Sequence, residues 1–117
     1  MTNSEVTNLY DCPRPTSPEE EEFFETLWSV PGTRIERIVS VGHSSAPDFS
    51  YDQDEDEWVL VLQGHAELEL EDGRRVELGH GDWFPIPARC RHRVARTSSE
   101  PACIWLAVWA ASGKSRQ

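Results

Sequence analysis

The 117-residue chain has no apolar run that approaches the ~20 residues of a membrane-spanning helix. Its first residues contain no basic segment followed by an apolar one, so we expect no signal peptide. The three cysteines are odd in number and show no metal-type CxxC spacing, so a reduced setting is the simplest interpretation. These absences predict a cytoplasmic protein without a membrane partner.

Basic residues are also scarce, because 11 Lys and Arg stand against 21 Asp and Glu and give a formal net charge of −10. The imbalance is uneven: residues 1–57 carry 14 acids and 3 bases, whereas residues 58–117 carry 7 acids and 8 bases. An acidic chain repels a phosphate backbone, so we expect no nucleic-acid partner. The acid surplus itself is interpreted as a feature that favours solubility.

The composition that is present suits one folded domain. A hydrophobic content of 38% and five tryptophans favour a packed core over disorder. We divide the chain into an N-terminal arm and helix over residues 1–32, a β-barrel over residues 33–110, and a polar tail over residues 111–117.

The first of these regions predicts a short N-terminal α-helix. Ser17 can cap it, Pro18 suits its first helical position, and Glu20 can complete a capping box. Pro31 and Gly32 would end it. Helical spacing relates four apolar residues that we expect to pack on the domain, namely Phe23, Phe24, Leu27 and Trp28.

The remainder of the chain reads as short strands separated by turn residues. Asp72-Gly73 is its strongest hairpin signal. This pattern indicates an all-β barrel or sandwich. The predicted strands cover residues 35–41, 57–62, 66–70, 74–78, 83–86, 92–96 and 102–109.

The last predicted strand is apolar on both faces over residues 103–109, although a barrel strand needs only one apolar face. Trp58, Leu60 and Leu62 would likewise give the strand at residues 57–62 a second apolar face. The second face must be covered by the helix, by another sheet or by a partner subunit. We favour a homodimer.

Glu57 and His92 are the polar side chains that alternation turns toward the barrel interior. Glu57 is in phase with Val59, and His92 is in phase with Val94. A buried carboxylate is costly unless it is paired, hydrogen-bonded or bound to a cation. Composition alone also allows Glu57 to be the last solvated acid of an acidic run, and a lone inward histidine to be a satisfied core residue.

The spacing around these two residues resembles that of the cupin superfamily, in particular small single-domain bacterial cupins. Glu57 and Gly64 match the end of the first cupin motif. The resemblance covers about residues 33–109 and implies a cupin-type double-stranded β-helix, or jelly-roll, barrel. The second motif is matched by Gly81, Pro87 and His92, with Arg89 in place of its glycine and Arg96 in place of its asparagine.

The first motif departs from the family pattern at its front. Cupins usually carry a His-any-His pair shortly before the glutamate that corresponds to Glu57. A three-residue gap puts Tyr51 and Gln53 at those positions, whereas a four-residue gap puts Ser50 and Asp52 there. Neither alternative supplies the two histidines.

The resemblance implies a divalent transition metal, for which the remaining ligands would be Gln53, Glu57 and His92. Tyr51 or a water could complete a mixed nitrogen and oxygen set suited to Zn, Mn, Fe or Ni, although it would bind more weakly than three imidazoles. Without a metal, Glu57 and His92 could bond each other or a polar ligand. Tyr51 and Arg96 are the candidate ligand-binding residues, because Arg96 is in phase with His92 and could hold an anionic group.

Three functions stay open at this point. The first is metal-dependent chemistry of the dioxygenase, isomerase or lyase type on a small polar or anionic metabolite, as the resemblance implies. The second is a non-catalytic or regulatory module that binds a small ligand without a metal. The third is a structural dimer with a filled barrel, and the fold alone does not decide among them or settle whether the protein is an enzyme.

Overall fold

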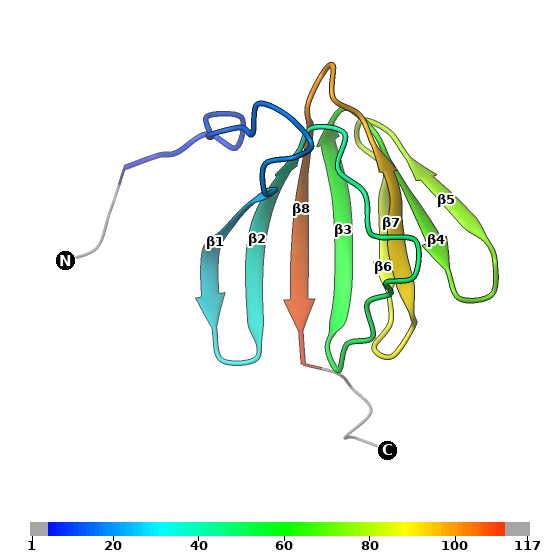
Figure 1. Cartoon of the computed structure of the whole chain (residues 1–117). Helices are drawn as coiled ribbons and strands as arrows, with labels where there is room; N and C mark the ends of the chain where they lie inside the picture. Colours follow the sequence, from blue (N-terminus) through cyan, green and yellow to red (C-terminus); the bar gives the residue numbers. More distant parts are fainter. Residues whose placement is uncertain (1–4, 112–117) are drawn as a thin grey trace.

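The structure is a computed structural model, and it describes residues 5–111. Eight strands make two antiparallel sheets in this range, as Figure 1 shows. One sheet has five strands in the order β1-β2-β8-β3-β6, and the other has three in the order β5-β4-β7. The strands are β1 (Phe23–Val30), β2 (Thr33–Ser40), β3 (Asp56–Gln63), β4 (Ala66–Leu70), β5 (Arg75–Leu78), β6 (Trp83–Ile86), β7 (His92–Thr97) and β8 (Cys103–Ala110).

The predicted all-β barrel is confirmed. All seven predicted runs are strands, and their ends move by at most two residues. Inward side chains of both sheets make the main core, because alternate positions on each strand share one face. That core contains Ile38, Val59, Val61, Ala66, Leu68, Leu78, Ile86, Cys103, Trp105 and Ala107.

The predicted N-terminal helix is wrong, because Phe23–Val30 form β1, which pairs antiparallel with β2. The helix-start signal makes only a turn, in which the Glu20 N–H donates to the Ser17 carbonyl at 3.2 Å. A bulge between Thr26 and Trp28 lets helically spaced apolar residues divide between the two faces of a strand. Pairing along the length of β2 therefore outweighs local helix propensity. Residues 5–111 include no helix long and apolar enough to cross a membrane.

An irregular N-terminal arm covers part of the outer face of the five-stranded sheet. The buried Arg37 guanidinium donates to the carbonyls of Asn8 and Leu9 at 3.3 and 3.1 Å. The Tyr10 hydroxyl donates to the Leu62 carbonyl at 3.2 Å. The arm thus packs on the domain, as the helix was expected to do. A second core cluster lies beneath it, formed by Val39, Val41, Ala102 and Ile104 with Cys12, Phe23 and Leu62 packed against them.

The rest of this outer face carries what we call the apolar row, a line of side chains across all five strands. Strand register places its members side by side: Trp28, Ile35, Val108, Trp58 and Pro85. Trp83 lies next to the row, with its ring 5.5 Å from that of Trp58. Trp28 and Trp83 are 55% and 57% exposed, so the row is open to solvent in a single chain.

Candidate functional site

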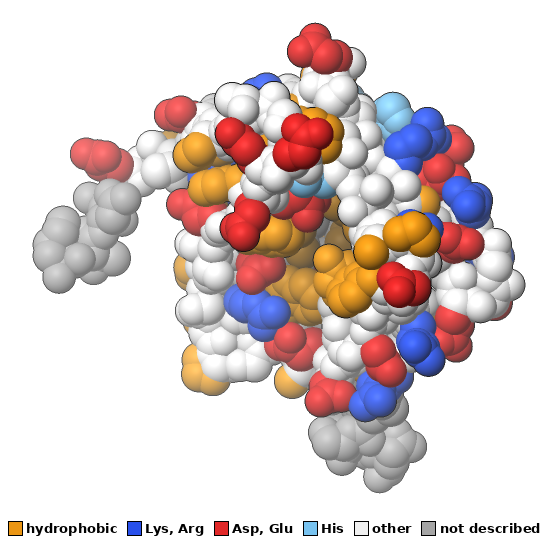
Figure 2. Space-filling model, in the orientation of Figure 1, with side chains coloured by type: hydrophobic (Ala, Val, Ile, Leu, Met, Phe, Trp, Pro, Cys, Tyr) orange, Lys and Arg blue, Asp and Glu red, His pale blue; other side chains and the backbone are white. Residues whose placement is uncertain are grey.

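A cavity of about 70 Å³ lies between the two sheets. Figure 2 shows it as a hollow with hydrophobic side chains in its floor and carboxylates around its rim. The predicted site residues Tyr51, Gln53, Glu57 and His92 all line it. The other lining residues are Glu22, Phe24, Glu36, Ile38, Val59, Leu68, Ile86, Val94, Trp105 and Trp109.

His92 begins β7 opposite Leu70, and its side chain is buried with one ring nitrogen fixed. Nδ1 lies 2.9 Å from the Cys90 carbonyl oxygen, which can only accept a hydrogen bond. Nδ1 therefore carries the proton, and Nε2 presents a lone pair. Burial lowers the pKa of His92 below its ordinary value, so the imidazole is neutral at neutral pH.

Tyr51 holds His92 from the neighbouring loop. The two backbones exchange hydrogen bonds, with Tyr51 N–H donating to the His92 carbonyl at 2.7 Å and His92 N–H donating back at 3.2 Å. The two rings stack with centroids 5.3 Å apart. This pairing fixes the position of the imidazole before any ligand arrives.

Glu57 is the second buried polar group, positioned in β3 between Ile86 of β6 and Trp109 of β8. Its side chain is 8% exposed, and burial raises its pKa to about 7. Oε1 lies 3.7 Å from Nε2 of His92, which is too long for a hydrogen bond. Because the imidazole is neutral and the carboxyl group is partly protonated near pH 7, the two are a facing acid and base rather than a fixed ion pair.

Gln53, and not Asp52, points into the cavity. Its Nε2 donates to Glu57 Oε1 at 3.3 Å, whereas Asp52 pairs with Arg89 at 3.0 Å. Of the two alternatives, the residue of the three-residue gap, Gln53, is thus the one that lines the cavity. Arg89 also explains how the chain manages without the motif glycine, because it adopts the left-handed φ of 68° and its N–H donates to the Gln53 carbonyl at 2.7 Å.

The predicted metal ligands Gln53, Glu57 and His92 come together but make an incomplete set. His92 is suited to the role, because a ligand imidazole usually donates its other N–H to a carbonyl or carboxylate. Gln53 turns its amide nitrogen toward Glu57, and amide oxygen is in any case a weak ligand. Residues 5–111 contain no group of three or more His, Cys, Asp or Glu side chains that could hold a metal ion. The residues present thus supply two strong ligands where catalytic sites usually keep three, and do not fit a firmly held metal.

Two carboxylates that sequence reasoning missed also line the cavity. Glu36 accepts from the indole N–H of Trp109 at 3.1 Å. Glu22 accepts from the Ser40 hydroxyl, which itself accepts from the Trp105 indole at 3.3 Å. Alternation with inward Ile38 could have identified Glu36. Nothing in the sequence separated Glu22 from the other acids of its run.

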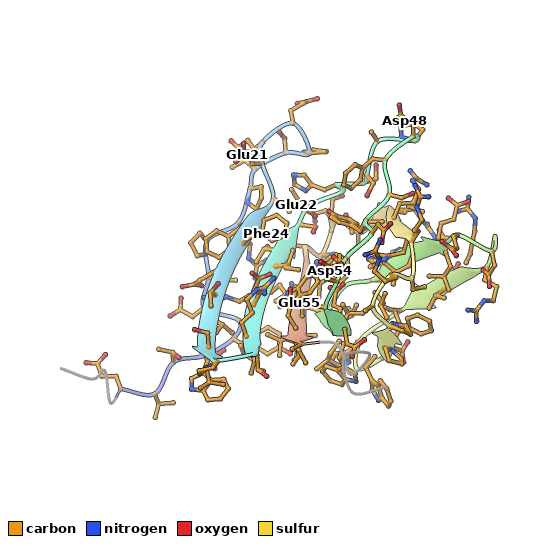
Figure 3. All side chains as sticks on the ribbon, turned by 90° about the horizontal axis from the view of Figure 1, so that it is seen from below. Glu21, Glu22, Phe24, Asp48, Asp54 and Glu55 are labelled. Carbon is orange, nitrogen blue, oxygen red and sulfur yellow. The ribbon has the colours of Figure 1, made fainter. Side chains whose placement is uncertain are left out.

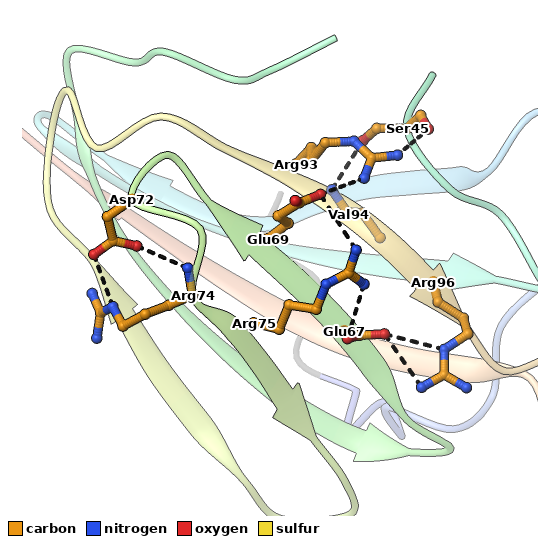
Figure 4. Close-up of polar contacts among 9 residues, drawn as sticks. All are labelled: Ser45, Glu67, Glu69, Asp72, Arg74, Arg75, Arg93, Val94 and Arg96. Carbon is orange, nitrogen blue, oxygen red and sulfur yellow. Dashed lines mark hydrogen bonds and ion pairs between the residues drawn. The ribbon is translucent and has the colours of Figure 1, made fainter. Parts of the chain in front are cut away.

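The structure contradicts the prediction that Arg96 shares the inward face of His92. A register shift places Val94 opposite Leu68 but Arg96 opposite Glu67, so the phase of β7 changes between them. Arg96 lies on the outer face of the three-stranded sheet, 3.3 Å from Glu67, in the charged network of Figure 4. It does not line the cavity, and we assign it no ligand-binding role.

Comparison with known proteins places the chain among the cupins. The family model Cupin_2, described as "Cupin domain", matches residues 36–109. A solved structure from Ralstonia eutropha JMP134, described as a "putative mannose-6-phosphate isomerase", is 41% identical with a TM-score of 0.84, and the match covers 92% of this chain and 99% of that one. A cupin superfamily protein from Desulfitobacterium hafniense DCB-2 is 18% identical with a TM-score of 0.68, covering 87% of this chain and 93% of that one, and shows the fold alone.

A comparison with curated proteins gives no match. The family model covers more than half of the chain, and it includes both Glu57 and His92. Together with the double-sheet barrel and the 41% identity to the Ralstonia eutropha protein, this match settles the family. The chain belongs to the Cupin_2 cupin domain family.

Proposed function

We propose that this protein binds a small polar molecule in the barrel and holds one hydroxyl or amine group of it between Glu57 and His92. The observation that carries the proposal is the facing pair of Glu57 Oε1 and His92 Nε2, 3.7 Å apart and both buried. They are too far apart to bond each other, yet a single ligand atom can lie within hydrogen-bond reach of both. A pair that merely filled the core would be expected to close this gap.

Proton transfer is the chemistry that this pair supports best. A carboxyl group with a pKa of about 7 can give or take a proton near neutral pH. The Nε2 lone pair of His92 can accept a proton at the same time. Isomerisation by proton transfer needs a base that removes a proton and an acid that returns one, and the Ralstonia eutropha relative is described as a "putative mannose-6-phosphate isomerase". The proposed reaction class is therefore proton transfer on a bound small molecule.

A ligand screen tests the binding step. Small sugars, alcohols and amines that bind should raise the unfolding temperature of the natural protein. His92→Ala should weaken binding of the same compounds roughly 10- to 100-fold, because a hydrogen bond to a buried group is lost. The Glu77→Gln variant is the control, since Glu77 is exposed on β5 outside the cavity. Equal binding by all three proteins would contradict the proposal.

A metal-loaded site is the second candidate, favoured by the Nδ1–H tautomer of His92. Total-metal analysis of protein purified without a metal-affinity tag distinguishes this metal-loaded site from the metal-free ligand site proposed above. The incomplete donor set predicts transition metal well below one atom per chain. Near-stoichiometric metal that disappears in Glu57→Gln or His92→Ala would instead establish the metal site.

We also propose that the apolar row is covered by a second copy of the chain. A two-fold axis would pack two copies of the row against each other, and Trp28 and Trp83 would then lose their exposure. Light scattering should give twice the chain mass of 13.3 kDa at micromolar concentration. Trp83→Glu should shift the protein toward monomer while it stays folded, because Trp83 is exposed in the single chain. A natural protein that is monomeric under these conditions would contradict the dimer.

A further inference from the structure

The cavity is lined by groups of one charge sign. Glu22, Glu36 and Glu57 contribute carboxylates to its wall, and none of the Lys and Arg residues within residues 5–111 lines it. Asp54 and Glu55 lie in the segment just before β3, on the same side of the molecule as Glu22 (Figure 3), but each is paired with an arginine, Asp54 with Arg89 and Glu55 with Arg34. A ligand that enters this cavity therefore meets a negative potential from the Glu22 and Glu36 carboxylates.

Arg34, which pairs with the cavity-lining Glu36, does not reverse that potential. Arg34 donates to both oxygens of Glu55 at 3.0 and 2.9 Å and to Glu36 at 3.2 Å. Its guanidinium also lies 4.8 Å from the centre of a Trp109 ring. Nε and Nη1 of Arg34 are thus used by Glu36 and Glu55, whose two carboxylates offset its single positive charge. A phosphate or carboxylate group in the cavity would be buried against like charge without a cation to balance it.

The hydrogen-bonding capacity of the lining points to a ligand rich in donors. The lining donors Trp105 Nε1, Trp109 Nε1 and Gln53 Nε2 already donate to Ser40, Glu36 and Glu57. His92 Nδ1 is likewise used by the Cys90 carbonyl. The acceptors that face the cavity are the lone pair of His92 Nε2 and the carboxylate oxygens, beside the Tyr51 hydroxyl, which can donate or accept. An ammonium group has several N–H donors and no acceptor, so it complements this set.

Aromatic side chains supply an independent reason. Tyr51, Trp105, Trp109 and Phe24 line the same cavity as the carboxylates. The face of an aromatic ring attracts a cation, most strongly once the cation has lost its water. Aromatic walls with carboxylates between them therefore favour an organic cation over a neutral molecule of the same shape.

We infer that the ligand of this cavity is a small organic cation that carries a protonated amine, held among Glu22, Glu36 and the Glu57–His92 pair. The inference rests on the proposed ligand-binding function and names the charge class of its ligand. It argues against a sugar-phosphate substrate, because no Lys or Arg among residues 5–111 lines the cavity to balance the phosphate charge.

Three probes of equal length test the charge class: n-butylammonium, 1-butanol and butyrate. Their binding is followed by NMR through the indole N–H signals of Trp105 and Trp109. Butylammonium should bind at least about tenfold more tightly than butanol, and butyrate most weakly. Glu22→Gln should reduce the advantage of the cation several-fold, because it removes one charge and keeps an acceptor for Ser40. Glu77→Gln changes the net charge equally outside the cavity and should leave the advantage intact.

Two outcomes would overturn the inference. Butanol or butyrate binding as tightly as butylammonium would remove the charge preference while leaving a ligand-binding cavity. No saturable binding of butylammonium would reject the cation site, and the broader screen with His92→Ala would then decide separately whether the cavity binds any polar molecule.

Discussion

The Glu57→Gln variant should be more stable than the natural protein above pH 7, by up to about 3 kcal/mol. Burial raises the pKa of Glu57 from 4.5 to about 7 in the folded state. Between these two pH values the folded protein binds a proton that the unfolded chain has released, so the stability contributed by this group falls as pH rises. Above pH 7 the folded protein holds a buried charge. Glutamine has nearly the same shape and cannot ionise, so the variant avoids this cost.

The pH dependence identifies the cause. Chemical denaturation of both proteins from about pH 5 to about pH 8 should show a stability difference that is small at the acid end and reaches its plateau above neutrality. Glu77→Gln should show no such gain, because Glu77 is exposed. A gain that is constant with pH, or a Gln variant that is less stable at pH 8, would contradict a raised pKa at Glu57.

A gain of this kind also bears on function. A carboxyl group that destabilises the fold at neutral pH is not kept there for packing. The natural residue at Glu57 therefore fits a role in binding or proton transfer, because strain and buried polarity in proteins gather at functional sites.

Gly64→Ala should destabilise the fold by roughly 3 kcal/mol or more. Gly64 follows β3 and has a left-handed φ of 78°. A Cβ atom there would lie 2.3 Å from Ser98 Oγ and 2.8 Å from the Ala102 carbonyl oxygen. Ser98 cannot turn away freely, because its Oγ accepts from the His65 N–H and donates to the Pro101 carbonyl.

Gly73→Ala is the matched control for this prediction. Gly73 also has a left-handed φ, of 92°, but a Cβ there would have no atom within 4 Å. It should lose only the roughly 1–2 kcal/mol of backbone strain. Thermal or chemical unfolding of the two variants separates the cost of the close contact at Gly64 from the cost of backbone strain. Equal losses would show that the close contact at Gly64 contributes nothing, contrary to the structure.

The fold was largely predictable, because most strands have a signal in their own local sequence. Alternation in the run around Leu68 and the Asp72-Gly73 turn needs no knowledge of distant residues. Strand β1 was not predictable in this way, because the spacing of Phe23, Phe24, Leu27 and Trp28 suits a helix as well as a bulged strand. Its pairing with β2 decides the outcome, and the sequence does not display that non-local pairing.

The site residues were predictable where a sequence motif fixes their spacing. They were not predictable where a one-residue bulge changes which face of a strand a side chain lies on. Motif spacing identified Glu57 and His92, and the structure brings them to one cavity. Arg96 was misplaced, because the bulge that turns it outward has no sequence signal of its own. Arg89 shows the reverse case, since a non-glycine residue takes the left-handed conformation that the motif glycine would supply.

The most direct test of the facing Glu57–His92 pair is nitrogen NMR of the imidazole of His92, recorded with and without a bound small molecule. We predict a neutral ring at neutral pH with the proton on Nδ1, and a change at Nε2 when the ligand binds. The side chains of His43, His65 and His80 lie outside the cavity and should not respond. A proton on Nε2 in the free protein, or an Nε2 signal that does not change when a ligand saturates the cavity, would contradict the proposed site.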